Sequence, residues 1–153
     1  MKQLSTDYIN QELSSGTMKD EDLIPTFRDF LTSIAADCDI QEQVNILSSQ
    51  INDLPYDDEG NYIIENSRED AFDVLNDLFD LLDEIAPPGC YFGSCAGDGT
   101  SYGFWLLDVL GLRGYVEEQL FICLADLDTM SFIDLHKKLE TVTGVVKTAA
   151  ELG

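Results

Sequence analysis

The sequence predicts an α+β domain, in which about five helices pack with a small antiparallel sheet built on an aromatic hairpin. Apolar residues recur at spacings of three and four in several separate segments, which is typical of amphipathic helices. One stretch, residues 90–106, is instead rich in glycine and aromatic residues and is interrupted by a turn signal, as in a β-hairpin. The chain of 153 residues has the length of one ordinary domain, so we expect a single acidic domain over residues 1–153.

The first half of the chain predicts three helices. Thr17 and Asp20 form the start of a capping box, and the helix that follows places one apolar residue per turn on a single face. That face comprises Leu23, Phe27, Phe30, Leu31 and Ile34. A second amphipathic helix is expected over about residues 40–51, followed by a turn and a short β-like run at residues 62–64.

The third helix has the strongest pattern in the chain. Asn66 or Ser67 is the expected N-cap, and Pro87-Pro88-Gly89 ends the helix. The apolar stripe consists of Ala71, Phe72, Leu75, Leu78, Phe79, Leu82 and Ile85. The opposite face is acidic and carries Glu69, Asp70, Asp73, Asp77, Asp80, Asp83 and Glu84.

The hairpin over residues 90–106 is predicted to turn at Asp98-Gly99, a pair suited to tight primed turns. This register places Tyr91 on one face with Cys95, Tyr102, Phe104 and Leu106, and it places Phe92 opposite Trp105 on the other face. Two interpretations follow: the helices cover these aromatic side chains, or a partner does. Under the second interpretation the secondary contact surface consists of Tyr91, Tyr102 and Trp105.

Two further helices are expected after the hairpin. One covers about residues 115–127, with Val116, Leu120, Cys123 and Leu124 on one side. Ser131 caps the last helix, whose apolar repeat is Phe132, Leu135, Leu139, Val142 and Val146. The bases of this helix, Lys137, Lys138 and Lys147, make it the least negative surface of the chain. We expect this helix either to pack against the more acidic N-terminal half of the chain or to self-associate in a homodimer.

Charge is the most unusual property of the chain. Thirty Asp and Glu stand against eight Lys and Arg, a net charge of −22, of which −17 falls in residues 1–87. This balance argues against direct binding to nucleic acid or to an anionic membrane. Seven carboxylates between residues 69 and 84 span about 22 Å of helix, roughly one per 3.7 Å, close to the ~3.4 Å per phosphate of a DNA strand.

These carboxylates predict a binding face for a basic, nucleic-acid-binding protein, on which the acidic side chains take the place of DNA. The candidate partner-binding residues are Asp57, Asp58, Glu59, Glu69, Asp70, Asp73, Asp77, Asp80 and Glu84. The alternative is a solvated acidic face that serves solubility only.

Catalytic and metal-binding patterns are weak, and we expect no enzyme activity, cofactor or metal. Gly93-Ser94-Cys95 matches part of a papain-type nucleophile motif, but Phe92 stands where that motif has cysteine, and His136 is the only histidine available to a thiol hydrolase. A calcium loop centred on Gly60 fails at both ends. The chain shows neither an export signal nor a membrane span, which predicts a cytoplasmic protein with reduced cysteines.

Two motifs resemble signatures of small, uncharacterised acidic proteins of bacteriophages, prophages and other mobile elements. One is Tyr91-Phe92-Gly93, Gly97-Asp98-Gly99 and Gly103-Phe104-Trp105 at fixed spacing; the other is Gly16-Thr17-Met18, Glu21-Asp22-Leu23-Ile24-Pro25 and Phe27. Cys95 departs from the first signature, in which a histidine often occupies this place. The resemblance implies a setting of phage–host conflict, where small acidic proteins block CRISPR or restriction enzymes. It therefore favours a DNA-mimic type anti-CRISPR or anti-restriction protein, with an interaction or assembly module using the aromatic hairpin as the alternative.

Overall fold

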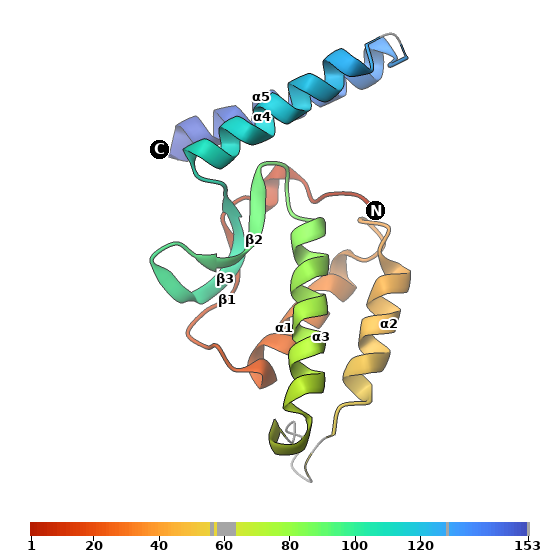
Figure 1. Ribbon diagram of the computed structural model, residues 1–153, viewed down its shortest axis with the longest axis vertical. Helices are drawn as coiled ribbons and strands as arrows, with labels where there is room; N and C mark the ends of the chain where they lie inside the picture. Colours follow the sequence, from red (N-terminus) through yellow and green to blue (C-terminus); the bar gives the residue numbers. More distant parts are fainter. Residues whose placement is uncertain (56, 58–63, 128, 153) are drawn as a thin grey trace.

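A computed structural model of the chain describes residues 1–55, 57, 64–127 and 129–152 (Figure 1). In these ranges it contains five α-helices and one three-stranded antiparallel sheet, which confirms the α+β prediction. The elements after a short 3-10 turn at Thr6–Tyr8 are β1 (Gln11–Ser14), α1 (Asp20–Ile34), α2 (Gln41–Asn52), α3 (Ile64–Glu84), β2 (Cys90–Cys95), β3 (Asp98–Leu106), α4 (Val109–Ala125) and α5 (Phe132–Leu152).

The helices α1, α2 and α3 contact one another, and the sheet packs on this group through α1 and α3 (Figure 1). The predicted apolar face of α1 is confirmed, since Leu23, Phe27 and Leu31 are at most 1% exposed. The N-cap of α1 is Lys19 and not Thr17. The Thr17 hydroxyl instead donates to the carboxylate of Asp22 at 2.6 Å, so this threonine stabilises the first turn from two residues further out.

Helix α3 begins at Ile64, earlier than predicted, so Asn66 and Ser67 lie inside the helix and do not cap it. Of the expected strand over 62–64, residues 62 and 63 lie outside the described residues, and Ile64 is already helical. The apolar stripe is confirmed except for Phe72, which is 58% exposed, while Val74 and Leu81 are buried. Phe72 lies about 100° around the helix from Ala71, which is enough to turn its ring away from the core.

The third strand is β1, which the sequence did not predict. Its four residues, Gln-Glu-Leu-Ser, are mostly polar and do not alternate with apolar residues as in a typical strand. It forms one edge of the sheet, whose order is β1-β3-β2. The turn of the hairpin is also not where it was predicted. Asp98 already belongs to β3 and pairs with Cys95, so the chain reverses at Ala96 and Gly97, where Gly97 adopts a φ of +93°.

Together with a register shift between Ser94 and Cys95, this turn changes the pairing of the aromatic residues by one position and so exchanges the faces of β2 relative to those of β3. Phe92 pairs with Phe104, and Tyr91 pairs with Trp105, whereas the predicted register placed Phe92 opposite Trp105. The face of Phe92 and Phe104 is covered by helices. Phe27 of α1 lies at the centre of this aromatic cluster, with ring centroids 5.2 Å from Phe92, 5.4 Å from Phe79 and 6.1 Å from Tyr102.

Gly103 of β3 pairs with Glu12 of β1 and lies close to the backbone of that strand. A Cβ atom added there would lie 2.9 Å from the Cα atom of Glu12 and closer still to the Gln11 carbonyl oxygen. We expect Gly103→Ala to lower the free energy of unfolding by about 1–3 kcal/mol, because the backbone of β1 must shift. Gly99→Ala, at a site with open space, is the matched control for chemical denaturation, and equal stabilities of the two variants would contradict the register of β1.

Helices α4 and α5 form an antiparallel hairpin that lies across one end of the rest of the chain (Figure 1). Asp108 caps α4 by accepting from the Gly111 amide at 2.7 Å, so α4 starts six residues before its predicted start. Ser131 caps α5 as predicted, accepting from the Asp134 amide at 3.1 Å. Gly89, with a φ of +75°, lets Val145 of α5 approach the backbone between α3 and β2.

The predicted apolar side of α4 is only partly correct. Cys123 is buried and Val116 is half-buried, but Leu120 and Leu124 are 43% and 72% exposed. The main hydrophobic core contains no residue of α4 or α5. Among the helices and strands, α4 and α5 contact chiefly each other, and α5 borders residues 3–6 of the N-terminal segment and Pro88.

Candidate functional site

Five carboxylates of α3 form a single row along the helix. Their positions repeat at spacings of three and four residues, so at about 100° per residue they lie on one stripe. The row spans roughly 21 Å with one carboxylate about every 5 Å, and every member is exposed. This acidic row consists of Asp70, Asp73, Asp77, Asp80 and Glu84.

Helix α2 lies beside the acidic row and forms the other wall of a groove. One hollow lies between Asp70, Asp73, Asp77 and Val74 of α3 and Gln50, Asp53 and Leu54 at the end of α2. The next hollow lies between Asp77, Asp80, Glu84 and Leu81 of α3 and Gln43, Ile46, Leu47 and Gln50 of α2. Because both hollows are lined by Gln50 and Asp77, they join into one acidic groove.

The lining of the groove favours long polar side chains over a small apolar molecule. The two hollows measure about 270 Å³ and 260 Å³. Their walls combine carboxylates, amides and the half-exposed side chain of Ile46. Long cationic side chains fit such a lining, since their apolar stems can lie on Ile46 and Leu47 while their charged ends reach the acidic row.

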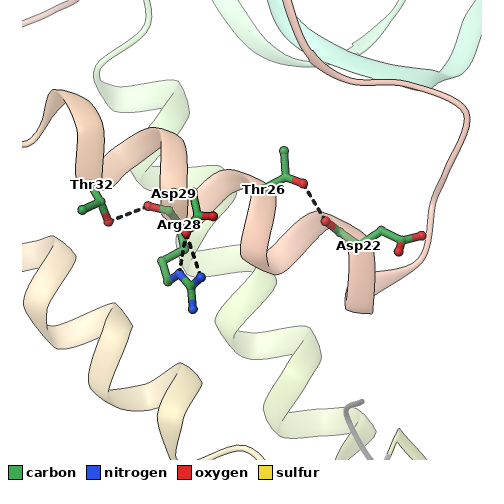
Figure 2. A network of polar contacts seen from close by, with 5 residues as sticks. All are labelled: Asp22, Thr26, Arg28, Asp29 and Thr32. Carbon is green, nitrogen blue, oxygen red and sulfur yellow. Dashed lines mark hydrogen bonds and ion pairs between the residues drawn. The ribbon is translucent and has the colours of Figure 1, made fainter. Parts of the chain in front are cut away.

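Arg68 is the basic residue nearest to the acidic row in sequence, and its side chain is not among those described. The three other basic side chains of the first half of the chain are occupied elsewhere. Arg28 of α1 bonds the carboxylate of its neighbour Asp29 at 2.7 Å, as Figure 2 shows. Lys2 pairs with Asp39 at 3.0 Å, and Lys19 pairs with Glu21 at 3.3 Å. Among the side chains that the structure describes, no cation lies within ion-pair distance of the acidic row. Its negative charge is therefore not compensated by these residues.

The structure brings together only some of the predicted binding residues. Glu69 is exposed on the flank of α3 and does not line the groove, and Asp57 is exposed beyond the end of α2. Asp58 and Glu59 lie outside the described residues. Sequence reasoning missed the α2 wall, although Gln43, Ile46 and Gln50 repeat at the spacing of one helix face.

Asp83 has a structural role that separates it from the acidic row. Its carboxylate accepts a hydrogen bond from the Phe92 amide at 2.8 Å and so joins the end of α3 to β2. A carboxylate bonded to the backbone in this way holds the first strand of the hairpin against α3.

The three predicted aromatic contact residues do not form one surface. Tyr102 packs on Phe27 and Phe79, while Tyr91 and Trp105 lie on the opposite face of the sheet. The Trp105 indole donates to the Gly93 carbonyl at 2.9 Å, and the Tyr91 hydroxyl donates to the Ser94 carbonyl at 3.2 Å. These polar groups are thus used within the hairpin, which favours a structural role for its aromatic residues.

The thiols show no nucleophile geometry among the described residues. His136 lies on α5 and contacts Glu140 at 3.3 Å, and Cys95 donates weakly to the Ala96 carbonyl. Burial raises the pKa of the Cys90 thiol to about 11, the opposite of the shift that activates a cysteine.

We expect Cys90 to be alkylated at pH 8 about a hundredfold more slowly than a free thiol of pKa 9.0. Because the raised pKa leaves less thiolate, the rate should keep rising as the pH increases toward 11. Iodoacetamide labelling of the intact protein, quantified by peptide mass spectrometry, measures this rate. A rate equal to that of the free thiol would contradict the burial of Cys90.

Within residues 1–55, 57, 64–127 and 129–152, no three His, Cys, Asp or Glu side chains gather closely enough to hold a metal ion. None of the helices in these ranges is both long and apolar enough to cross a membrane.

No protein-family model matches the chain, and no curated protein or solved structure is significantly similar to it.

Proposed function

We propose that this chain is a non-enzymatic acidic binding protein whose groove takes a basic segment of a nucleic-acid-binding protein in place of nucleic acid. The observation that supports the proposal is the acidic row: five exposed carboxylates in line along one groove, without a cation beside them among the described side chains. A partner with Lys or Arg side chains would gain charge-assisted hydrogen bonds along the whole row.

The acidic row is unfavourable for the helix that carries it. Its four neighbouring like-charge pairs destabilise α3 by roughly 0.2–0.5 kcal/mol each. Asp80 and Glu84 also lie near the negative end of the helix dipole. Intrahelical stability would therefore favour lysine or glutamine at these positions, so the row is better explained by an external cation than by the needs of the fold.

The spacing of the carboxylates in the groove indicates how the basic side chains of the partner are arranged. Only five of the seven carboxylates between residues 69 and 84 line the groove, at one per ~5 Å, which is sparser than the phosphates of a DNA strand. The distance of ~5 Å between neighbouring carboxylates is close to the rise of one turn of an α-helix. A partner helix with a Lys or Arg at each turn would place its cations opposite the acidic row, so the groove imitates the charge of a nucleic acid rather than its atomic spacing.

The resemblance of the two sequence motifs supplies the setting of the proposal. In a phage or mobile element, an acidic groove of this kind would block the basic nucleic-acid channel of a host defence nuclease, such as a CRISPR or restriction enzyme. The partner is then a protein of the host cytoplasm. Because this chain and the nucleic acid would occupy the same channel of the partner, binding of one would exclude binding of the other.

Capture from a bacterial lysate tests the proposal. The immobilised protein should retain basic nucleic-acid-binding proteins at low salt and release them at high salt or on addition of duplex DNA. A solvated face that serves only solubility predicts no such capture. Retention that is insensitive to both salt and DNA would contradict the proposal.

A further inference from the structure

The α4–α5 hairpin exposes most of the large apolar side chains that the structure leaves uncovered. Outside residues 109–152, four large apolar residues are exposed among those described, whereas this hairpin exposes eleven. They are Val109, Leu110, Leu120, Phe121, Leu124, Leu127, Phe132, Ile133, Leu139, Val146 and Leu152. Apolar exposure on this scale marks an interaction surface.

These residues form a stripe on α4, and three of the five on α5 follow a heptad pattern. At 100° per residue, the five exposed apolar residues within α4 fall in one arc of about 120°. On α5, Phe132, Leu139 and Val146 are seven residues apart and alternate with Leu135, Val142 and Ala149, as in the a and d positions of a heptad repeat. Val142 is buried, but Phe132 is 90% exposed, so α4 covers only one edge of the α5 stripe.

The two stripes are joined by an apolar groove between the helices. Its lining consists of Val109, Leu112, Arg113, Val116 and Glu117 of α4 with Val146 and Ala149 of α5. The hairpin therefore resembles one half of a four-helix bundle, in which two such pairs bury their a and d residues against each other.

The charge of the α4–α5 hairpin indicates that a second copy of this chain covers its apolar face. Two pairs of opposite sign, Arg113–Glu117 and Lys147–Glu151, occur along the two helices. Residues 109–152 carry a net charge of only −3, against −17 for residues 1–87. A strongly basic partner would bind the acidic groove in preference, whereas a second hairpin of charge −3 meets this surface with little local repulsion.

The area of this apolar face is also close to that of a standard interface. α4 is about 25 Å long, and two helices side by side are roughly 20 Å wide, so one face of the hairpin projects about 500 Å². Protruding side chains such as Phe121 and Phe132 raise the accessible area above the projected area. The face thus approaches the ~800 Å² per partner of standard interfaces.

We propose that two copies of the chain associate through their α4–α5 hairpins to form a four-helix bundle with twofold symmetry. Helices α2 and α3, which line the acidic groove, lie away from the α4–α5 hairpin (Figure 1), so the groove remains open in the dimer. The inference does not depend on the proposed function.

Sedimentation equilibrium of the full chain tests the dimer. We expect a mass of about 34 kDa, twice the 17.0 kDa of one chain. The exposed double substitution Phe121→Asp/Leu124→Asp should reduce the mass to that of one chain, while Met18→Asp, an exposed apolar residue outside the hairpin, should leave the dimer intact. Circular dichroism would verify that all variants fold.

Salt dependence separates this interface from the acidic groove. High salt screens the repulsion between two chains of charge −22, so it should tighten the dimer, whereas it should weaken binding of a basic partner in the groove. A wild-type mass of 17.0 kDa at all concentrations, or a dimer that survives the double substitution, would overturn the inference.

Discussion

Lysine at four positions of the acidic row is expected to abolish partner binding while leaving the domain folded. The substitutions are Asp73→Lys, Asp77→Lys, Asp80→Lys and Glu84→Lys. Each exposed charge contributes at most about 1 kcal/mol, so a single change should weaken binding only several-fold. Together the four changes should lower the affinity by about a thousandfold, because roughly 4 kcal/mol of attraction is lost.

The same variant should be at least as stable as the wild type. Lysine at positions 80 and 84 faces the negative end of the α3 dipole, Asp70 gains an opposite charge at position 73, and lysine has a higher helix propensity than aspartate, while three Lys–Lys pairs replace three carboxylate pairs of the same spacing. Thermal unfolding should therefore show an unchanged or higher Tm. Loss of binding would then result from the loss of the carboxylates and not from unfolding of the protein.

A matched control reverses four exposed carboxylates outside the groove and so changes the net charge equally. Suitable positions are Asp7, Asp37, Glu118 and Asp126. Titration of the captured partner should give near-wild-type affinity for this control. If both variants lost the same affinity, total charge and not the acidic row would drive binding; if neither did, the proposed groove would be wrong.

The largest expected effect on stability is that of Phe27→Ala. The Phe27 side chain is fully buried and contacts the rings of Phe79, Phe92 and Tyr102, so it joins α1, α3 and the hairpin in one cluster. Its truncation should lower the free energy of unfolding by about 3–5 kcal/mol through lost burial and the cavity that remains. For a chain of this length the Tm should fall by about 10 °C or more.

Phe72→Ala is the control for this experiment because it removes the same side chain from an exposed position of α3. We expect its free energy of unfolding to change by less than about 0.5 kcal/mol. Differential scanning calorimetry of the two variants measures both effects. Similar losses would contradict the assignment of Phe27 to the core and of Phe72 to the surface.

The helices were the part of the fold that the sequence predicted best. Leu23, Phe27 and Leu31 are buried as their spacing indicates, because an amphipathic helix must bury its apolar stripe whatever its partner is. Strand β1 was missed because its pairing with β3, and not its own polar residues, makes it a strand. The predicted hairpin register was wrong by one residue because the chain turns at Ala96 and Gly97, where Gly97 has a positive φ, and because the register shifts again between Ser94 and Cys95.

For the candidate site, the sequence alone determined that α3 has one acidic and one apolar face, because the 3.6-residue period fixes which side chains share a side of a helix. Only the tertiary structure decided which carboxylates line a groove, since that depends on where α2 lies and on which side chains, like Asp83, already bond the backbone. The same holds for α4 and α5. Their apolar residues are evident in the sequence, but whether another element covers them is a property of long-range packing, which no local pattern encodes.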